Sequence, residues 1–466
     1  MNARVFGCVV ATVCLSGSLR ADDWSRFRGP NGTGVSPDAA NVPAEWSPTE
    51  NLKWKVALPG PGSSCPIVVG DRIFVTSWSG YGVDREKLGR KEDLRRHLVC
   101  VDKQTGSVLW DKSVEAVLPE DDYQGMFAEH GFASHTPVSD GERVYAFFGK
   151  TGVIAFDLLG NELWRKSVGD GLDPREWGSA SSPVLYKDTV IVTAAAESNS
   201  IVAFNKLTGE EKWKQVAGGL DSTWGTPVLV KVNDERTDLV IGVPGEIWGI
   251  NPDNGKLAWY CEAIGENSFC SSVVPGDGIV YAVEGMGGGS IAVRAGGKGD
   301  VTSTHVVWRG RDNNRISTPV LLDGRLYFFS QRRANCIDAK TDERIYQARL
   351  ASAGGTPAPP ERGPGPGAGG GPGGRGPGGR GRGFGGGFGG GGFGGQDYAS
   401  PIAADGKIYV MTRAGDCFVV KAGPKFEQLA VNRVTEDAED FSATPAIAGN
   451  ELFIRSSKNL YCVAAK

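Results

Sequence analysis

The residue types best suited to chemistry in this sequence are two histidines. His130 and His135 lie five residues apart in the stretch EHGFASHTP. Two imidazoles can share a metal ion, but a protein site needs further ligands to hold it, and no third ligand is evident. The alternative is that both rings form ordinary hydrogen bonds within a loop. We therefore predict no metal site here.

Motifs that carry catalysis are missing from the sequence. It contains no G-x-S-x-G, H-E-x-x-H or Walker-type stretch, and no C-x-x-C-H for haem attachment. Each of those patterns places a nucleophile, a metal ligand or a phosphate-binding loop where its reaction needs it. A net charge of −4, with 50 Lys and Arg against 54 Asp and Glu, argues against a nucleic-acid surface. We predict no catalytic residue and no nucleic-acid partner.

The remaining candidates for binding stand just before a recurring proline. They mix aromatic and charged side chains, which suits a peptide or a small polar ligand. The alternative is that these loop residues satisfy one another. The candidates are His130, His135, Arg175, Trp177, Trp224, Arg315 and Asp440.

A repeated unit of sequence must position these side chains. The unit begins with a small or hydroxyl residue and Pro, continues through apolar residues to a turn of the Asp-Gly type, and ends in an alternating strand. Examples are STPVLLDGRLYFF and ASPIAADGKIYVM. The proline, or the residue in its place, stands at Pro66, Pro137, Pro183, Pro227, Val273, Pro319, Pro401 and Pro445. Successive spacings are 71, 46, 44, 46, 46, 82 and 44 residues, and most of them match a four-stranded propeller blade. We predict an all-β, eight-bladed β-propeller over residues 50–466, with the candidates around one mouth of its channel.

The second half of most units ends in a tryptophan that we predict to dock neighbouring blades. Its large face suits packing between sheets, and its N–H needs an acceptor when buried. The last unit stops after its third strand at LYCVAAK, whereas the N-terminus has an orphan strand, ENLKWKVAL. We predict that this N-terminal strand closes the last blade and that residues 22–49 form an arm before it. The docking residues are Trp54, Trp110, Trp164, Trp213, Trp259 and Trp308.

The repeated unit also explains most of the cysteines. One equivalent position in the repeats is expected to lie between blades and to favour a small apolar side chain. We predict that it is occupied by Cys100, Cys336, Cys417 and Cys462. Cys261 and Cys270 lie outside the pattern. A disulfide between these two is one possibility, and two separate thiols are the other.

Two segments lie outside the repeats. Residues 1–21, with Arg4 before a short apolar run and a cleavage point after Ala21, predict a signal peptide and export to the periplasm or envelope. An uncleaved anchor is the alternative, but the run is short for a bilayer. Residues 354–396 are dominated by Gly and Pro with a few Arg. They predict a disordered loop that acts as a spacer, or alternatively as a polyanion-binding segment.

The alternation of an apolar strand, Asp or Asn, a Thr-Gly turn and a closing Trp resembles the pyrroloquinoline-quinone (PQQ) repeat of quinoprotein dehydrogenases. It is equally similar to the repeat of the non-enzymatic outer-membrane assembly factor BamB. RFRGPNGTGVS and KAGPKFEQLAVN resemble PQQ-like propeller proteins of planctomycete-type bacteria. The match covers about residues 50–466 apart from the Gly-rich insertion, and Tyr346 stands where the sixth copy should have its Trp.

The resemblance implies two alternative functions. One is a non-catalytic binding or scaffolding module in the envelope, with an envelope protein or peptide as partner and a monomeric chain. The other is a PQQ-dependent alcohol or sugar oxidoreductase with a divergent site and Ca²⁺. Quinoprotein dehydrogenases of this type usually carry a pair of adjacent bridged cysteines and a Trp floor. This chain has no Cys-Cys pair, and Trp177 or Trp224 is the only floor that the resemblance suggests.

Overall fold

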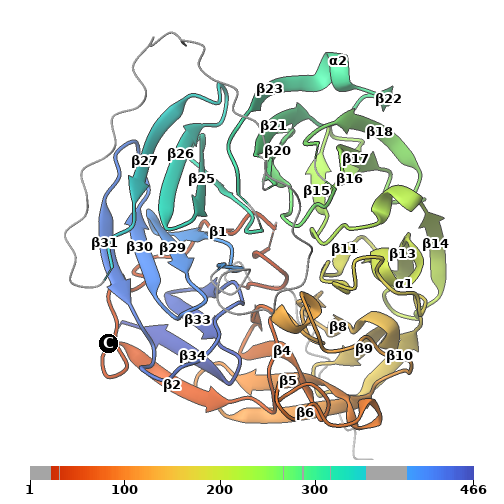
Figure 1. Cartoon of the computed structure of the whole chain (residues 1–466), viewed down its shortest axis with the longest axis vertical. Helices are drawn as coiled ribbons and strands as arrows, with labels where there is room; N and C mark the ends of the chain where they lie inside the picture. Colours follow the sequence, from red (N-terminus) through yellow and green to blue (C-terminus); the bar gives the residue numbers. More distant parts are fainter. Residues whose placement is uncertain are drawn as a thin grey trace, which may run out of the picture.

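The computed structural model describes residues 23–30, 32–265, 267–285, 288–314, 316–352 and 396–465. Over these ranges eight sheets of four antiparallel strands surround a central axis (Figure 1). The predicted eight-bladed propeller is therefore confirmed. The predicted signal peptide and, except for Gln396, the predicted disordered loop lie outside the described residues.

Each blade runs outwards from a short inner strand at the channel. Blades one and two contain β3 (Ile67–Val69), β4 (Arg72–Ser79), β5 (Arg95–Asp102), β6 (Val108–Glu115), β7 (Val138–Ser139), β8 (Arg143–Phe147), β9 (Val153–Asp157) and β10 (Glu162–Lys166). Blades three and four contain β11 (Val184–Tyr186), β12 (Thr189–Ala194), β13 (Ser200–Asn205), β14 (Glu211–Val216), β15 (Val228–Lys231), β16 (Thr237–Val243), β17 (Glu246–Ile250) and β18 (Leu257–Glu262).

The second half of the ring repeats this order. Blades five and six contain β19 (Val274–Gly276), β20 (Ile279–Glu284), β21 (Gly289–Arg294), β23 (Val306–Gly310), β24 (Val320–Leu322), β25 (Arg325–Ser330), β26 (Arg333–Asp338) and β27 (Arg344–Arg349). Blades seven and eight contain β28 (Ile402–Ala404), β29 (Lys407–Met411), β30 (Cys417–Lys421), β31 (Gln428–Asn432), β32 (Ala446–Ala448), β33 (Glu451–Arg455), β34 (Asn459–Ala464) and β2 (Leu52–Ala57).

The few remaining elements are short additions to these blades. β1 (Val35–Ser36) pairs with β28, and β22 (Gly299–Asp300) pairs with β18, both in parallel. The helical turns are η1 (Lys91–Asp93), η2 (Phe127–Glu129), η3 (Gly149–Thr151), η4 (Gly218–Leu220), α1 (Ala195–Ser198) and α2 (Thr302–His305).

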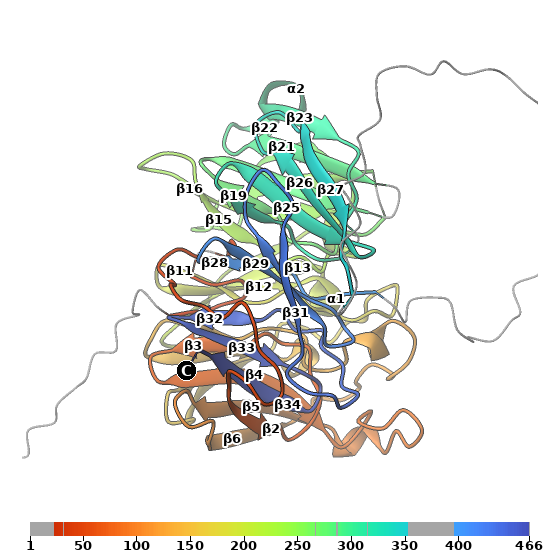
Figure 2. The ribbon, with the colours of Figure 1, turned by 90° about the vertical axis from the view of Figure 1, so that its left-hand side faces the viewer.

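The predicted closure of the ring is confirmed. β2 pairs antiparallel with β34, with Trp54 opposite Cys462, and both views place the two strands side by side (Figures 1 and 2). A first and a last segment of the chain thus share one sheet, and β2 covers the outer edge of β34. This arrangement ties the termini together and removes an edge that would otherwise offer unpaired backbone groups.

The tight turns of the repeat have the backbone that the sequence demands. At Asp323-Gly324 and Asp405-Gly406 both residues of each turn have positive φ, between 50° and 72°. Two-residue hairpins of this type match the twist of antiparallel strands, and Asp followed by Gly adopts them at low cost. The turns therefore set the register of the inner hairpin in these blades.

The hydrophobic core is divided into layers between adjacent blades. Between blades one and two, for example, Phe74 and Cys100 pack with Val144 and Ala146, all fully buried. Successive layers continue around the ring. Because each blade has cores on both faces, its strands read as nearly continuous apolar runs.

The N-terminal arm crosses the middle of the ring, where Figure 1 shows it in red. Trp24 is buried and exchanges backbone hydrogen bonds with Val68 of blade one, and the Ser25 carbonyl accepts from the N–H of Ser139 in blade two. Farther along, Gly34 accepts from Ala403 of blade seven. The arm therefore closes one end of the channel.

Two buried arginines fix this arm to backbone carbonyls. Arg28 donates to the carbonyls of Thr318 (3.0 Å), Pro319 (2.5 Å) and Pro401 (3.2 Å), which join blades six and seven. Arg26 donates to the Pro227 carbonyl of blade four at 3.3 Å. Burial lowers the pKa of Arg28 to about 9 because the guanidinium gives up water.

A later part of the arm replaces a missing tryptophan. Blade seven has no Trp in its outer strand, β31, and the arm supplies Trp46 in its place. The Trp46 ring stacks on Tyr409 with centroids 6.3 Å apart, and its backbone N–H donates to Asn432 at 3.1 Å. The sequence offered no repeat signal for this contact.

Candidate functional site

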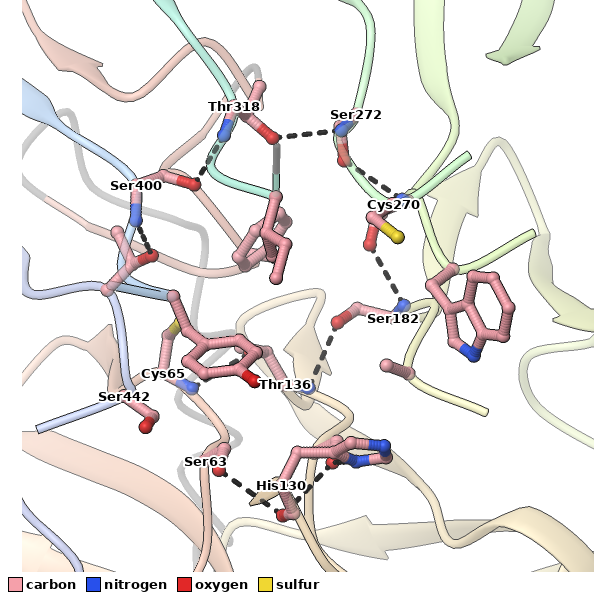
Figure 3. Close-up of a pocket in the computed structure, with 18 of the residues that line it drawn as sticks. Ser63, Cys65, His130, Thr136, Ser182, Cys270, Ser272, Thr318, Ser400 and Ser442 are labelled. Atoms are coloured by element: carbon pink, nitrogen blue, oxygen red, sulfur yellow. Dashed lines mark hydrogen bonds between the residues drawn. The ribbon is translucent and has the colours of Figure 1, made fainter. Parts of the chain in front are cut away.

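A belt of side chains lines the channel where each inner strand begins. The residue before each repeat proline has its backbone N–H directed at the side chain of the same residue in the next blade. The belt residues are Cys65, Thr136, Ser182, Thr226, Ser272, Thr318, Ser400 and Thr444. Seven of these hydrogen bonds, from Cys65 round to Thr444, measure 2.9–3.0 Å. Figure 3 shows most of the belt as a chain of dashed lines around the pocket.

The eighth link closes the belt on a thiol instead of a hydroxyl. The Thr444 backbone N–H donates to the sulfur of Cys65, and the hydroxyls of Thr444 and Thr136 also contact it. Burial raises the pKa of this thiol. Arg455 lies behind it, fully buried, and donates to the Ser64 carbonyl at 2.9 Å. The belt thus uses its polar side chains to satisfy inner-strand N–H groups that would otherwise be buried without partners.

A pocket of about 230 Å³ occupies the channel at the level of the belt. Phe27 of the arm lies on one side of it, and loops that precede the inner strands lie on the other. Among the described residues that line it, one carries a carboxyl group, Glu284. The lining residues beyond the belt are Phe27, Ser63, Met126, His130, Ser134, Trp177, Ala180, Trp224, Ser268, Cys270, Glu284, Gly285, Ile316, Tyr398 and Ser442.

Three of the predicted binding residues meet at this pocket. The rings of Trp177 and Trp224 lie 5.0 Å apart at 34°. The indole N–H of Trp224 donates to the Gly178 carbonyl at 2.7 Å. His130 Nε2 donates to the Trp177 carbonyl at 2.7 Å, so its Nδ1 accepts from Ser134 Oγ at 2.5 Å. Burial lowers the pKa of His130, and the ring is therefore neutral.

Glu284, which sequence reasoning missed, ends the second strand of blade five and is 1% exposed. Its Oε1 accepts from the Cys270 N–H at 3.1 Å, and its Oε2 accepts from the Ser271 N–H at 2.8 Å. Ser271 Oγ also donates to Oε2, at 2.5 Å. Burial raises the pKa of Glu284 to about 7, against the opposing effect of these donors.

His135 lies behind the pocket and does not line it. Its Nε2 donates to Ser179 Oγ at 3.1 Å, because that hydroxyl in turn donates to Glu197 Oε1 at 2.5 Å. Burial lowers the pKa of His135 to about 3 and raises that of Glu197 to about 7. The two predicted histidines therefore belong to separate hydrogen-bonded groups. Within the described ranges, no three His, Cys, Asp or Glu side chains gather closely enough to hold a metal ion.

The other predicted binding residues lie around the mouth. Arg175 donates to Ser222 Oγ at 2.8 Å and to the Asn267 carbonyl at 2.7 Å, with its guanidinium 5.4 Å from the Trp177 ring centroid. Asp440 accepts from Arg413 Nε at 2.5 Å. Neither side chain lines the pocket. Arg315 lies outside the described residues.

Five of the six predicted docking tryptophans donate to the next blade. Their indole N–H groups bond at 2.9–3.1 Å to the carbonyl just after the Asp or Asn of the next turn. The pairs are Trp54 to Lys103, Trp110 to Leu158, Trp164 to Lys206, Trp213 to Pro252, and Trp308 to Ala339.

Trp259 is different, and the reason is local. Residues 295–305 of blade five, which include β22 and α2, replace the short turn that would accept its N–H. Trp259 instead donates to Asp238 Oδ2 of its own blade at 2.7 Å, and Arg236 binds the same carboxylate. Its ring lies over Gly249, where an added Cβ would stand 2.0 Å from the indole.

Two expectations about cysteines are also resolved. Cys100, Cys336 and Cys462 stand opposite Trp110, Tyr346 and Trp54 at one equivalent position. Val419, not Cys417, holds this place in blade seven, where it faces Ala430 before the bulge. The prediction for Cys417 was wrong by two residues, because the outer strand of blade seven lacks the Trp that marks the register. Cys261 is a free thiol whose Sγ donates to the Glu262 carbonyl, so it forms no disulfide with Cys270.

The fold and pocket define a PQQ-like β-propeller with a narrow cavity in its channel. The family model described as "Outer membrane protein assembly factor BamB" matches residues 30–222 and, overlapping, 153–362. The chain therefore belongs to this family.

Individual relatives are distant. Polyvinylalcohol dehydrogenase from a Pseudomonas species is 24% identical over 300 residues. That alignment covers 46% of each protein, so the chain spans about half the length of the curated relative it matches.

Solved structures agree with this chain in fold. BamB from Moraxella catarrhalis is 12% identical, with a TM-score of 0.57 over 89% of this chain and 97% of that one. A europium-containing methanol dehydrogenase is 10% identical, with a TM-score of 0.58 over 95% and 98%. None of the helices in the described part of this chain has the length and apolarity to cross a membrane.

Proposed function

We propose that this protein is an exported, non-catalytic binding module of the cell envelope and that the pocket is its ligand site. The observation that supports this proposal is that the polar groups around the pocket already form hydrogen bonds within the protein. Seven of the eight belt residues present a hydroxyl that accepts a neighbouring N–H, as Thr136 does from Cys65 and Ser182 from Thr136. His130 already has a hydrogen-bond partner at each ring nitrogen, and burial lowers its pKa. Such groups shape and hydrate a cavity without activating a nucleophile.

Family membership supports the same reading. The matching family is named for an assembly factor, and a solved BamB shares the fold. We therefore propose a peptide or protein of the envelope as the partner, with Trp177 and Trp224 among the contacts. Aromatic pairs supply contact area at low entropic cost, which is why they recur at binding sites.

The alternative is a PQQ-dependent oxidoreductase, favoured by the similarity to polyvinylalcohol dehydrogenase. PQQ carries three carboxylates and binds most readily where cationic side chains face it. The described lining of the pocket has one carboxyl and no Lys or Arg. Arg26 and Arg28, close by in the arm, are directed to backbone carbonyls. The two indoles contact each other, so no planar group fits between them. The residues present do not fit this cofactor.

An assay with PQQ, Ca²⁺ and a redox dye across a panel of alcohols separates the two functions. We expect no cofactor-dependent dye reduction and no saturable quenching of tryptophan fluorescence by PQQ. Turnover that depends on PQQ and disappears in Trp177→Ala or Trp224→Ala would falsify the binding-module proposal. N-terminal sequencing of the protein from cell envelopes tests export, with a mature chain beginning at Asp22 as the expected result.

A further inference from the structure

The charge inside the pocket points to a particular class of ligand. Among the described lining residues, Glu284 is the one acidic side chain, and no Lys or Arg accompanies it. Burial lowers the pKa of His130, which favours its neutral ring. The belt hydroxyls can each donate and accept, so they do not select a charge. When Glu284 is ionised, the described part of the lining therefore carries one negative charge.

The guanidinium groups near the pocket do not cancel this charge from within. Arg413 at the mouth is bound by Asp440 and Glu129. Arg175 donates to Ser222 and to the Asn267 carbonyl. Arg455 lies near Cys65 and binds the Ser64 carbonyl there. Arg28 binds the carbonyls of Thr318, Pro319 and Pro401, which belong to blades six and seven. These contacts are all to neutral oxygens, so both guanidinium groups keep their charge, and a bound cation is favoured only in direct contact with Glu284.

Aromatic rings complete the site. Trp177, Trp224 and Tyr398 line the same cavity as Glu284. Arg175 and Arg413 already lie 5.4 and 5.3 Å from the ring centroids of Trp177 and Tyr398, so an ammonium group would share these two rings with a guanidinium. The faces of Trp and Tyr rings attract ammonium groups, and this attraction strengthens where water is excluded. Glu284 itself is held in place by two backbone N–H groups and Ser271, so it is positioned before any ligand arrives.

We propose that this pocket binds the ammonium group of an amine, with Glu284 as counter-charge and Trp177, Trp224 and Tyr398 as aromatic wall. This inference rests on the proposed binding function and adds the chemical class of its ligand. A cavity of about 230 Å³ has room for a group the size of a lysine side chain or of benzylamine. A lysine side chain or an N-terminal amine of a peptide would meet the same requirements.

Three probes of similar shape and different charge test the proposal on the full chain: benzylamine, benzyl alcohol and benzoate. Binding is measured at pH 8 by calorimetry and by the fluorescence of the pocket tryptophans. Benzylamine should bind about tenfold or more tightly than benzyl alcohol, from ion pairing and cation–π attraction together. Benzoate should bind weakest of the three.

Two matched variants locate the effect. Glu284→Gln should bring benzylamine to within about twofold of benzyl alcohol, because the charge is lost and the shape kept. Glu197→Gln is the control: Glu197 is equally buried and hydrogen-bonded to a serine, but it does not line the pocket. It should leave the preference for benzylamine unchanged. If Glu284→Gln fails to fold, the order of the three probes on the unaltered protein still decides.

The possible failures are distinguishable. Benzyl alcohol or benzoate binding as tightly as benzylamine would overturn the amine inference and leave a binding pocket in place. An undiminished preference in folded Glu284→Gln would also overturn it, because another group would then hold the ammonium. If none of the three probes binds, the pocket is not a ligand site, and the proposed function fails together with this inference.

Discussion

At the scale of single residues, the belt shows how a repeated dipeptide links neighbouring blades by hydrogen bonds. At seven of the eight belt positions a hydroxyl accepts the N–H of the equivalent residue in the preceding blade, as the Thr226 hydroxyl does from Ser182 at 3.0 Å. The recurring Ser or Thr was visible in the sequence, but its partner lies 44 residues away in the next blade. Only the ring geometry shows that the two copies touch.

The belt makes a prediction about stability. Thr226→Val keeps the side-chain volume but leaves the buried Ser182 N–H without an acceptor. We expect a loss of about 1–3 kcal/mol in the free energy of unfolding, the cost of orphaning a buried donor. Thr226→Ser keeps the hydroxyl and should lose less. Urea unfolding of the two variants measures the difference, and equal losses would contradict a role for the hydrogen bond.

Gly249 offers a second test at this scale. Blades one, two, three, five and six have Cys or Ala at this place, but Trp259 folds over Gly249 and leaves no room for a Cβ. Glycine to alanine in a strand would ordinarily stabilise. Here we expect Gly249→Ala to destabilise by about 1–3 kcal/mol through overpacking. In a protein that already carries Trp259→Leu, Gly249→Ala should cost less than it does in the wild type. Thermal unfolding of the wild type, the two single variants and the double variant would show whether the two positions couple.

At the scale of elements, the repeat predicted the strands and the closure, because each strand has its own alternating pattern and turn. Sequence reasoning failed where a contact falls outside the repeat. Trp46 fills the gap in blade seven from an arm with no periodic signal. The insertion in blade five redirects Trp259, and the missing Trp in blade seven shifts the apparent place of Cys417. Glu284 was overlooked for the same reason, because nothing local marks a strand-end glutamate as the one that meets the channel.

The closing strand gives the prediction for this scale. Trp54 is 9% exposed, donates to the Lys103 carbonyl of blade one, and lies against Gly106. Trp54→Ala should lower the free energy of unfolding by about 3–5 kcal/mol, as expected for a large buried ring. Lys53→Ala, one residue away, removes a partly exposed ion pair with Glu451 and should cost about 1 kcal/mol or less. Similar losses in the two variants would mean that β2 is not held by its tryptophan.

At the scale of the whole molecule, two glutamates buried in the described part of the ring stand out by the size of their pKa shift: Glu197 behind the pocket and Glu284 within it. Each has a pKa raised from 4.5 to about 7, with burial as the main cause. The folded protein therefore holds protons on these groups between pH 4.5 and 7, where the unfolded chain has released them. Protonation in this interval stabilises the fold, and the stabilisation is lost as the pH rises to the folded-state pKa.

The wild-type free energy of unfolding should accordingly fall between pH 4.5 and 7 relative to variants in which these groups cannot titrate. The linkage is worth at most about 3.5 kcal/mol for each carboxyl, at about 1.4 kcal/mol per unit of pKa difference. Glu197→Gln and Glu284→Gln should each remove part of this fall, and the double variant should remove both parts, because the two groups make separate contacts. Urea unfolding at half-unit steps from pH 4 to pH 8 measures the slopes, with the other titrating groups common to all four proteins. A slope identical in wild type and double variant would mean that neither carboxyl retains its proton in the folded ring.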